Sequence, residues 1–527
     1  MTHKISRRQF LGEASCASVG SASLFSTLLN MKMTSAAASF DAAASFDADS
    51  ADDDYKALVC LFLAGGNDSF NMLVPSGSAE YSEYQSARSD LALAQGSLLS
   101  LNGTDDQGRA FGVHPSMPEV QQLYNNGDLA FVANVGTLVE PTSKAAYDAG
   151  SAKLPVGLFS HIDQIAHWQT SVPDKRTGLG WGGRTADLLK SLNSNQNISM
   201  NISLSGTNTF QAGTSVIDYA IEPRGNGSIG IRGFDRPIET VDVLKKAAIE
   251  SMLDLEYQNL FEQTYRNTTR TAINNHSQFS TAIAGVSPFA TQFSTNQVSQ
   301  SMQMIAKTIA ARQTLGFKRQ TFFVLFGGWD HHDEVLNSQM AMLAIVSKAM
   351  NEFNAAMKEL GVHDKVTTFT ASDFARTLTS NGRGSDHAWG GNHMVMGGAV
   401  KGNKIYGDYP SLYADNPLDV GRGSLIPTIS CDEYFAELAL WFGVNSADLD
   451  TVFPNIHRFY SYQPTTAPVG FLSGNTTAPP VELGPYKTYI PLVGHNYGNR
   501  RTSAAVSGMA ALAAGALAIR RRLEDSP

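Results

Sequence analysis

Short apolar runs alternate with longer stretches of helical spacing along most of the chain. The runs are rich in β-branched and aromatic residues, as buried strands are. They cover residues 58–66, 129–136, 198–206, 321–328, 365–373 and 393–400. Apolar residues recur at helical spacing over 338–360 and over 432–442, the latter behind Ser430 as a helix cap. This order predicts an α/β fold with a mostly parallel sheet and helices on both faces.

Acidic residues and histidines follow several of these runs, at the strand ends where parallel sheets place their chemistry. The residues are Asp68, Asp330, His331, His332, Asp373, Asp386, His387 and His393. Since the whole chain holds three cysteines, this set predicts oxygen and nitrogen ligands for a divalent metal such as zinc, manganese, magnesium or calcium. Two ions held about 4 Å apart by such ligands suit displacement at phosphorus.

Each of these residues also has a simpler explanation when it is taken alone. Asp68 follows two glycines and suits a turn, and the Asp386–His387 pair suits an ordinary loop. Neighbouring side chains point in opposite directions in an extended segment, so at most one of His331 and His332 is expected to bind a metal directly.

Ser160 stands where an apolar segment meets an expected helix N-terminus. A hydroxyl at the positive end of a helix favours an anionic ligand and suits a nucleophile. A plain N-cap serine explains the position equally well. His161 and His167 share the segment and either assist the serine or only pack.

Both ends of the chain carry sorting features. Residues 6–12, SRRQFLG, open a twin-arginine signal expected over 1–38, and an acidic linker follows over 39–54. A Pro/Thr/Gly-rich linker is expected over 461–502. The apolar, arginine-flanked tail at 503–527 predicts a membrane tether, a sorting tail or a buried amphipathic helix. We therefore expect export by the twin-arginine machinery to the periplasm or cell surface.

Composition narrows the classes of partner. The 527 residues include 39 Lys+Arg and 48 Asp+Glu, for a net charge of −9. An acidic chain without basic runs is not expected to bind nucleic acid. The cysteines are too few for a disulfide framework.

Several blocks of sequence resemble one bacterial family, the twin-arginine-exported family of unknown function numbered fifteen-oh-one. The blocks are LFLAGGNDSFNMLVP, FSHIDQIAHWQT, GLGWGGR, FGGWDHHDE and SDFARTLTSNGRGSDHAWGGNHMVMGGAVKG. The resemblance covers roughly 55–460 and implies the three-layer α/β/α sandwich of the alkaline phosphatase and sulfatase superfamily. Residues of about 206–317 would then form a helical insert or cap.

The resemblance also implies residue roles. The implied metal ligands are Asp68, Asp330, His332, Asp373, and His387 or His393, and the implied nucleophile is Ser160. Two departures stand out: Phe374 follows Asp373 where the superfamily often has histidine, and no formylglycine sequence surrounds Ser160.

These observations lead to one expected function and two alternatives. The expected protein is an exported metal-dependent hydrolase of phosphate or related esters, in which Arg376 or Arg383 holds the remaining charge of a small anionic substrate. The alternatives are a non-catalytic surface or binding protein on the same fold, and a sulfatase-like hydrolase.

Overall fold

The computed structural model describes residues 54–235, 238–413, 415–463 and 466–474. Its main feature is a nine-stranded sheet within these residues. In spatial order the strands are β11 (Ile405–Tyr406), β5 (Leu129–Gly136), β10 (Gly391–Met396), β9 (Val366–Ser372), β1 (Lys56–Ala64), β8 (Arg319–Gly327), β6 (Asn201–Ser203) and β7 (Tyr219–Ala220), and β12 (Ile429–Ser430) also pairs with β5. The sheet is mostly parallel, as predicted, and β10 runs antiparallel to both β5 and β9.

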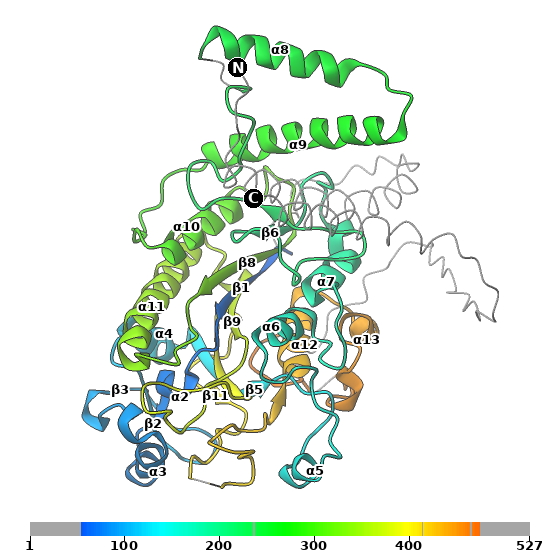
Figure 1. Ribbon diagram of the computed structural model, residues 1–527. Coiled ribbons are helices and arrows are strands. Elements are labelled where there is room, and N and C mark those ends of the chain that lie inside the picture. The colour runs from blue at the N-terminus through cyan, green and yellow to red at the C-terminus, as the bar shows by residue number, and fades with distance from the viewer. Residues whose placement is uncertain (1–53, 236–237, 414, 464–465, 475–527) are drawn as a thin grey trace, which may run out of the picture. The chain divides into compact units, whose positions relative to one another are not determined.

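Helices cover both faces of this sheet (Figure 1). One layer consists of α4 (Pro118–Asn125), α10 (Gln297–Ala310) and α11 (Val335–Glu359). The other consists of α6 (His161–Thr170), α7 (Trp181–Leu189), α12 (Cys431–Phe442) and α13 (Leu449–Val452). The predicted three-layer α/β/α sandwich is confirmed.

Coverage on both faces explains the sequence of the central strands. β1 reads KALVCLFLA and is buried from Ala57 to Leu63, with no alternation of polar and apolar residues. A strand buried on both sides needs apolar residues at every position. The predicted Ser430 cap is also present: its hydroxyl accepts from the backbone N–H of Glu433, whose side chain reaches back in a capping box.

Smaller elements flank the sheet. Three short strands form a second sheet near α2 (Ser69–Met72) and α3 (Ser78–Arg88). They are β2 (Leu73–Pro75), β3 (Leu99–Ser100) and β4 (Phe111–Val113). Helix α5 (Lys144–Asp148) lies in the connection between β5 and α6.

The expected insert at 206–317 is partly integral to the sandwich. β7 extends the sheet beyond β6, and α10 packs against α11 and β8. The rest of the insert contains a hairpin of two helices, α8 (Thr240–Asp254) and α9 (Leu260–Ala284). The chain between these two helices, from residue 255 to residue 259, is not helical.

The folded domain continues past Tyr460, where a linker was expected. Phe471 and Leu472 are buried in the core. The backbone N–H groups of Val469, Gly470 and Leu472 donate to the Glu437 carboxylate, so this stretch is fixed to α12. Among the described helices none is long and apolar enough to cross a membrane. The expected export signal, the acidic linker up to residue 53 and the apolar tail lie outside the described residues.

Candidate metal centre

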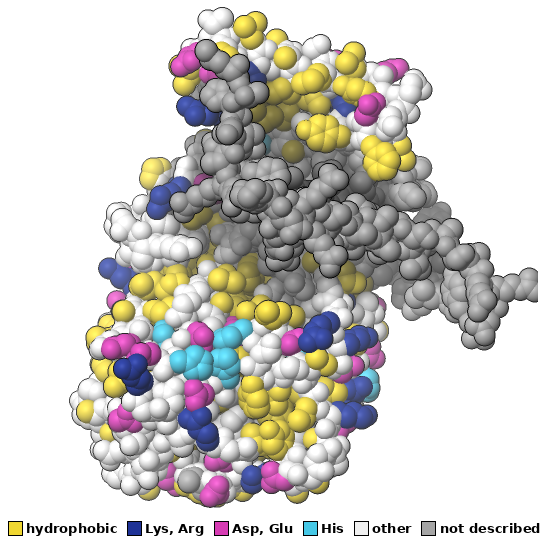
Figure 2. All heavy atoms as spheres, viewed as in Figure 1, with side chains coloured by type: hydrophobic (Ala, Val, Ile, Leu, Met, Phe, Trp, Pro, Cys, Tyr) yellow, Lys and Arg dark blue, Asp and Glu magenta, His cyan; other side chains and the backbone are white. Residues whose placement is uncertain are grey.

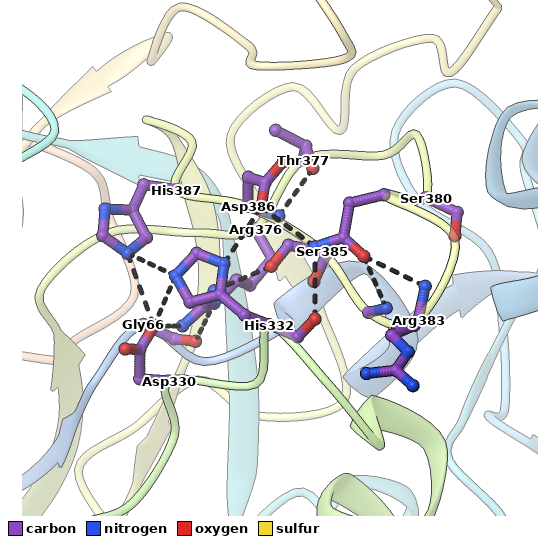
Figure 3. A network of polar contacts seen from close by, with 12 residues as sticks. Gly66, Asp330, His332, Arg376, Thr377, Ser380, Arg383, Ser385, Asp386 and His387 are labelled. Atoms are coloured by element: carbon purple, nitrogen blue, oxygen red, sulfur yellow. Dashed lines mark hydrogen bonds and ion pairs between the residues drawn. The ribbon is translucent and has the colours of Figure 1, made fainter.

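Three histidines and one aspartate meet beyond the carboxyl ends of the central strands. Asp330 and His332 follow β8, His387 lies between β9 and β10, and His161 is the first residue of α6. The Nε2 atoms of His332, His161 and His387 lie 3.0, 3.4 and 3.4 Å from Asp330 Oδ1. Figure 3 shows His332, His387 and Asp330 pointing toward one another. Four ligand-type atoms therefore surround one small volume.

Each of these histidines is held from behind through its Nδ1 atom. His161 Nδ1 lies 2.7 Å from Asp373 Oδ2, and His332 Nδ1 lies 2.9 Å from Asp386 Oδ1. His387 Nδ1 lies 2.8 Å from the Phe159 carbonyl oxygen. All three partners are acceptors, so the ring protons belong on Nδ1 and the Nε2 lone pairs face inward.

This tautomer assignment leaves the centre electrostatically incomplete. His332 Nε2 and His387 Nε2 are 3.0 Å apart and both present lone pairs. His161 Nε2 is buried and has no hydrogen-bond donor. A cation between Asp330, His161 and His387, whose ligand atoms lie within 4.8 Å of one another, would satisfy their inward-facing atoms, with His332 Nε2 beside Asp330 and His387, because imidazole nitrogen and carboxylate oxygen are ordinary ligands for zinc and for manganese. The residues present therefore fit a metal ion.

The surroundings favour the metal-binding charge states of His387 and Asp330, but not that of His161. Burial lowers the pKa of His387, which keeps the ring neutral. The hydrogen bond to Asp373 raises the pKa of His161, so protons compete with a metal there as the pH falls. Burial alone would raise the pKa of Asp330, but the Arg376 guanidinium and the nearby histidines outweigh it and lower that pKa.

Arg376 fixes Asp330 in place. Its guanidinium is fully buried and donates to Asp330 Oδ1 and to the carbonyl oxygens of Gly65, Gly66 and Ser385. The expectation that Arg376 holds substrate charge does not fit this environment, because its donors are used inside the protein. Arg376 is a positioning residue.

Gly65 allows the chain to pass close to the ligand segment. Its φ is +123°, and a Cβ there would lie 2.5 Å from the backbone nitrogen of Asp330. Its own N–H donates to Asp373 Oδ1 at 3.0 Å. Because glycine has no Cβ, the end of β1 can lie directly against the backbone of Asp330 and also donate a hydrogen bond to Asp373.

The centre is open to solvent. The side chains of Asp330 and His332 are 46% and 44% exposed. Figure 2 shows the histidines gathered at the surface, with acidic and basic side chains around them. A soluble substrate can therefore reach the ligand atoms.

Comparison with known proteins places the chain in a family. The model of DUF1501, described as a protein of unknown function, matches residues 55–421. The chain belongs to this family. No functionally curated protein matches its sequence.

Solved structures similar to this DUF1501 chain include hydrolases. A sulfatase, PsFucS1 from Pseudoalteromonas sp., is 11% identical with a TM-score of 0.31, over 75% of this chain and 68% of that chain. TAB5 alkaline phosphatase, a mutant with Mg bound, is 10% identical with a TM-score of 0.23, over 65% of this chain and 91% of that chain. At these identities the similarity concerns the fold.

The structure brings some of the predicted ligands of the DUF1501 chain together. Asp330, His332 and His387 supply ligand atoms, and Asp373 stands behind His161. Sequence reasoning did not select His161 as a ligand. The sequence places His161 next to Ser160 at the start of a helix. That position is as typical of an anion site or a helix cap as of a metal ligand.

The structure does not bring Asp68 and His393 into this centre. Asp68 forms a fully buried ion pair with Arg88. His393 is buried against Trp168, with ring centroids 4.7 Å apart, and burial lowers its pKa to about 3. The burial of each residue is explained by these neighbours.

The two remaining predicted residues flank the centre. Ser160 occupies the N-cap position of α6 directly before His161 without a capping hydrogen bond from its side chain, and its hydrogen bond to Asp163 helps to lower the pKa of that carboxyl, after the larger effect of Arg176. Arg383 is 78% exposed and lies 3.4 Å from Asp333. Arg422, which the sequence did not single out, pairs with Asp386; burial raises the pKa of that carboxyl, but hydrogen bonds from Asn381, Arg422 and His332 outweigh it and lower the pKa to about 2.

Proposed function

We propose that this protein is a metal-dependent hydrolase of phosphate or related esters. The observation that carries the proposal is the convergence of three Nε2 atoms on Asp330, each ring oriented by an acceptor at Nδ1. Sites of this composition hold catalytic zinc or similar ions. A bound ion there would lower the pKa of a coordinated water and polarise an ester oxygen.

The surrounding chain supports an anionic substrate. His161 and Ser160 lie at the N-terminus of α6, a ten-residue helix whose positive end faces the centre. The Ser160 hydroxyl, next to the ligand His161, is the candidate nucleophile if the substrate is not attacked by water. Arg422 and Arg383 lie at the rim and are exposed, so either can meet a charged group that extends from the centre.

Elemental analysis of protein purified without chelators tests the metal. We expect near-stoichiometric metal in the wild type and its loss in His161→Ala and His332→Ala. His457→Ala, an exposed histidine near Asp450, is the matched control and should keep the metal. Absence of metal after incubation with zinc, manganese and calcium would contradict the proposal.

Activity is tested separately, on phosphate and sulfate monoesters, with Ser160→Ala beside the wild type. If the protein hydrolyses phosphate esters and loses this activity when the metal is removed, the proposal is supported. Preference for sulfate esters would favour the sulfatase-like alternative. Bound metal without turnover on any ester would make the chain a binding protein on a hydrolase fold.

We also propose export by the twin-arginine machinery to the periplasm or cell surface. The arginine pair and the following weakly apolar stretch within residues 1–38 support it. A fusion of these residues to a reporter that is active only outside the cytoplasm tests it, with both arginines changed to lysine as the control.

A further inference from the structure

The α8–α9 hairpin exposes an unusual amount of apolar surface. Eighteen large hydrophobic side chains are exposed in the described residues, and nine of them lie between residues 238 and 265. All fifteen residues of α8 are described, and only Leu253 is buried. Figure 2 shows the apolar side chains gathered on this hairpin, which Figure 1 labels α8 and α9. Surfaces of this kind mark interaction sites.

Five exposed apolar residues of α8 and its C-terminal end form one stripe at helical spacing. The stripe consists of Val241, Leu244, Ala248, Met252 and Leu255, the last directly after the helix. Val241, Leu244, Met252 and Leu255 are 61%, 64%, 52% and 53% exposed, respectively. Steps of three and four residues keep such a set on one side of a helix, which is how helices present themselves to other helices.

The stripe is symmetric about its smallest residue. Leu244 and Met252 each lie four residues from Ala248, and Val241 and Leu255 each lie seven residues from it. When two copies of α8 cross antiparallel at Ala248, Leu244 meets Met252 of the second copy and Val241 meets Leu255. In a two-fold interface the same surface of both copies must fit itself, and here apolar residues meet apolar residues on both sides of the crossing. Alanine at the crossing lets the two backbones approach.

Area and charge favour a second copy over a membrane surface. The four large side chains bury about 100 Å² each and Ala248 about half of that, which gives roughly 450 Å² per copy and about 900 Å² in total, close to the ~1,000 Å² minimum of a specific interface before α9 contributes. Helix α8 carries Lys245 and Lys246 against Asp242, Glu250 and Asp254, so it lacks the basic face that anionic lipids attract.

We infer that the protein forms a two-fold symmetric dimer through antiparallel pairing of α8 with α8 of a second copy, centred on Ala248. The Leu260, Phe261 and Tyr265 side chains of α9 are 64–67% exposed and enlarge the apolar surface of the hairpin. The inference does not depend on the metal centre, so each proposal can fail without the other.

Light scattering after size-exclusion chromatography of the full chain tests the assembly. We expect a dimer for the wild type and a monomer for Leu244→Glu, whose circular dichroism spectrum should match that of the wild type because Leu244 is 64% exposed in the single chain. Val243→Glu is the matched control: Val243 is 54% exposed but lies off the stripe, so this variant should remain dimeric.

Single-cysteine cross-linking tests the register, in a background with Cys16→Ser; Cys60 and Cys431 are buried. Ala248→Cys should form a cross-linked dimer by itself. Leu244→Cys should not link to itself but should link when mixed with Met252→Cys. Glu250→Cys, on the opposite side of α8, should not link.

Three outcomes would overturn the inference. The first is a wild type that is monomeric up to about 100 μM. The second is self-linking of Leu244→Cys, which would indicate parallel helices. The third is a monomer that binds anionic or neutral lipid vesicles through the same stripe. A fourth outcome would do the same: a monomer that becomes a dimer only after removal of residues 503–527 would assign the stripe to the chain's own tail.

Discussion

Replacement of Asp373 by asparagine tests the metal centre most directly, because it changes one atom behind a ligand and none in front of it. The Asp373 carboxylate accepts two hydrogen bonds, from His161 Nδ1 at 2.7 Å and from the Gly65 N–H at 3.0 Å. An asparagine has one acceptor oxygen, so one of these donors would face its NH₂ group. If the Gly65 bond is kept, the proton of His161 moves to Nε2 and points at the metal position.

The expected loss follows from this change of tautomer. Partners behind metal-bound histidines are typically worth 10–100-fold in metal affinity, which corresponds to about 1.4–2.7 kcal/mol. We therefore expect Asp373→Asn to weaken zinc binding by a factor in this range, measured by competition with a fluorescent chelator. The fold should survive, since the substitution conserves volume.

Asp333→Asn is the matched control for that measurement. Asp333 is an exposed carboxylate on the same loop as the ligands, 3.4 Å from Arg383, and touches none of the three rings. Its replacement should leave zinc affinity unchanged. Wild-type affinity in Asp373→Asn would refute the assigned tautomers, and with them the argument that the centre binds a cation.

Three further predictions concern the support of the fold and the centre. Asp68→Ala leaves Arg88 buried without its partner and should cost about 3–5 kcal/mol in chemical denaturation, while the folded fraction keeps its metal. Gly65→Ala should reduce metal affinity in the same titration, whereas Gly127→Ala, with a φ of +82° and no atom within 4 Å of its added Cβ, should not. Burial raises the pKa of Asp432 to about 7, so the folded state holds a proton that the unfolded state loses above pH ~4. The free energy of unfolding should then fall as the pH rises from about 4 to 7, and it should depend less on pH in Asp432→Asn. Urea unfolding at several pH values measures both.

The sequence predicted the sandwich well because burial on both faces leaves a direct trace in it. The apolar run at 129–136 coincides with β5, and the run at 365–373 coincides with β9 to within a residue at each end. Helix α12 begins one residue before the expected start, immediately after its Ser430 cap. The hairpin break after α8 was not predicted, because the residues between the helices carry no glycine or proline.

The site was predicted less completely, because side-chain partners distant in sequence decide it. Asp330, His332 and His387 were found from their positions after strands. Asp68 follows a strand as well, but its interaction with Arg88 depends on α3 packing beside it, which no local pattern reveals. His161 is the opposite case, because it does not follow a strand in the sequence. It reaches Asp330 only because α6 packs against β9.

Because the ligands come from distant segments, only the finished fold can hold the ion. His161 and His387 are far apart in sequence, and the Arg376 guanidinium that steadies Asp330 depends on the carbonyl groups of Gly65 and Gly66 after β1 and of Ser385 in the loop between β9 and β10. A nascent or truncated chain offers at most the pair Asp330 and His332, which is a weak chelator. A metal bound at this centre would therefore be selected only after folding is complete, from the ions available in the compartment where that happens. A chain that folds before it is exported would carry a cytoplasmic ion outward, whereas one loaded later would report the metal supply of its destination.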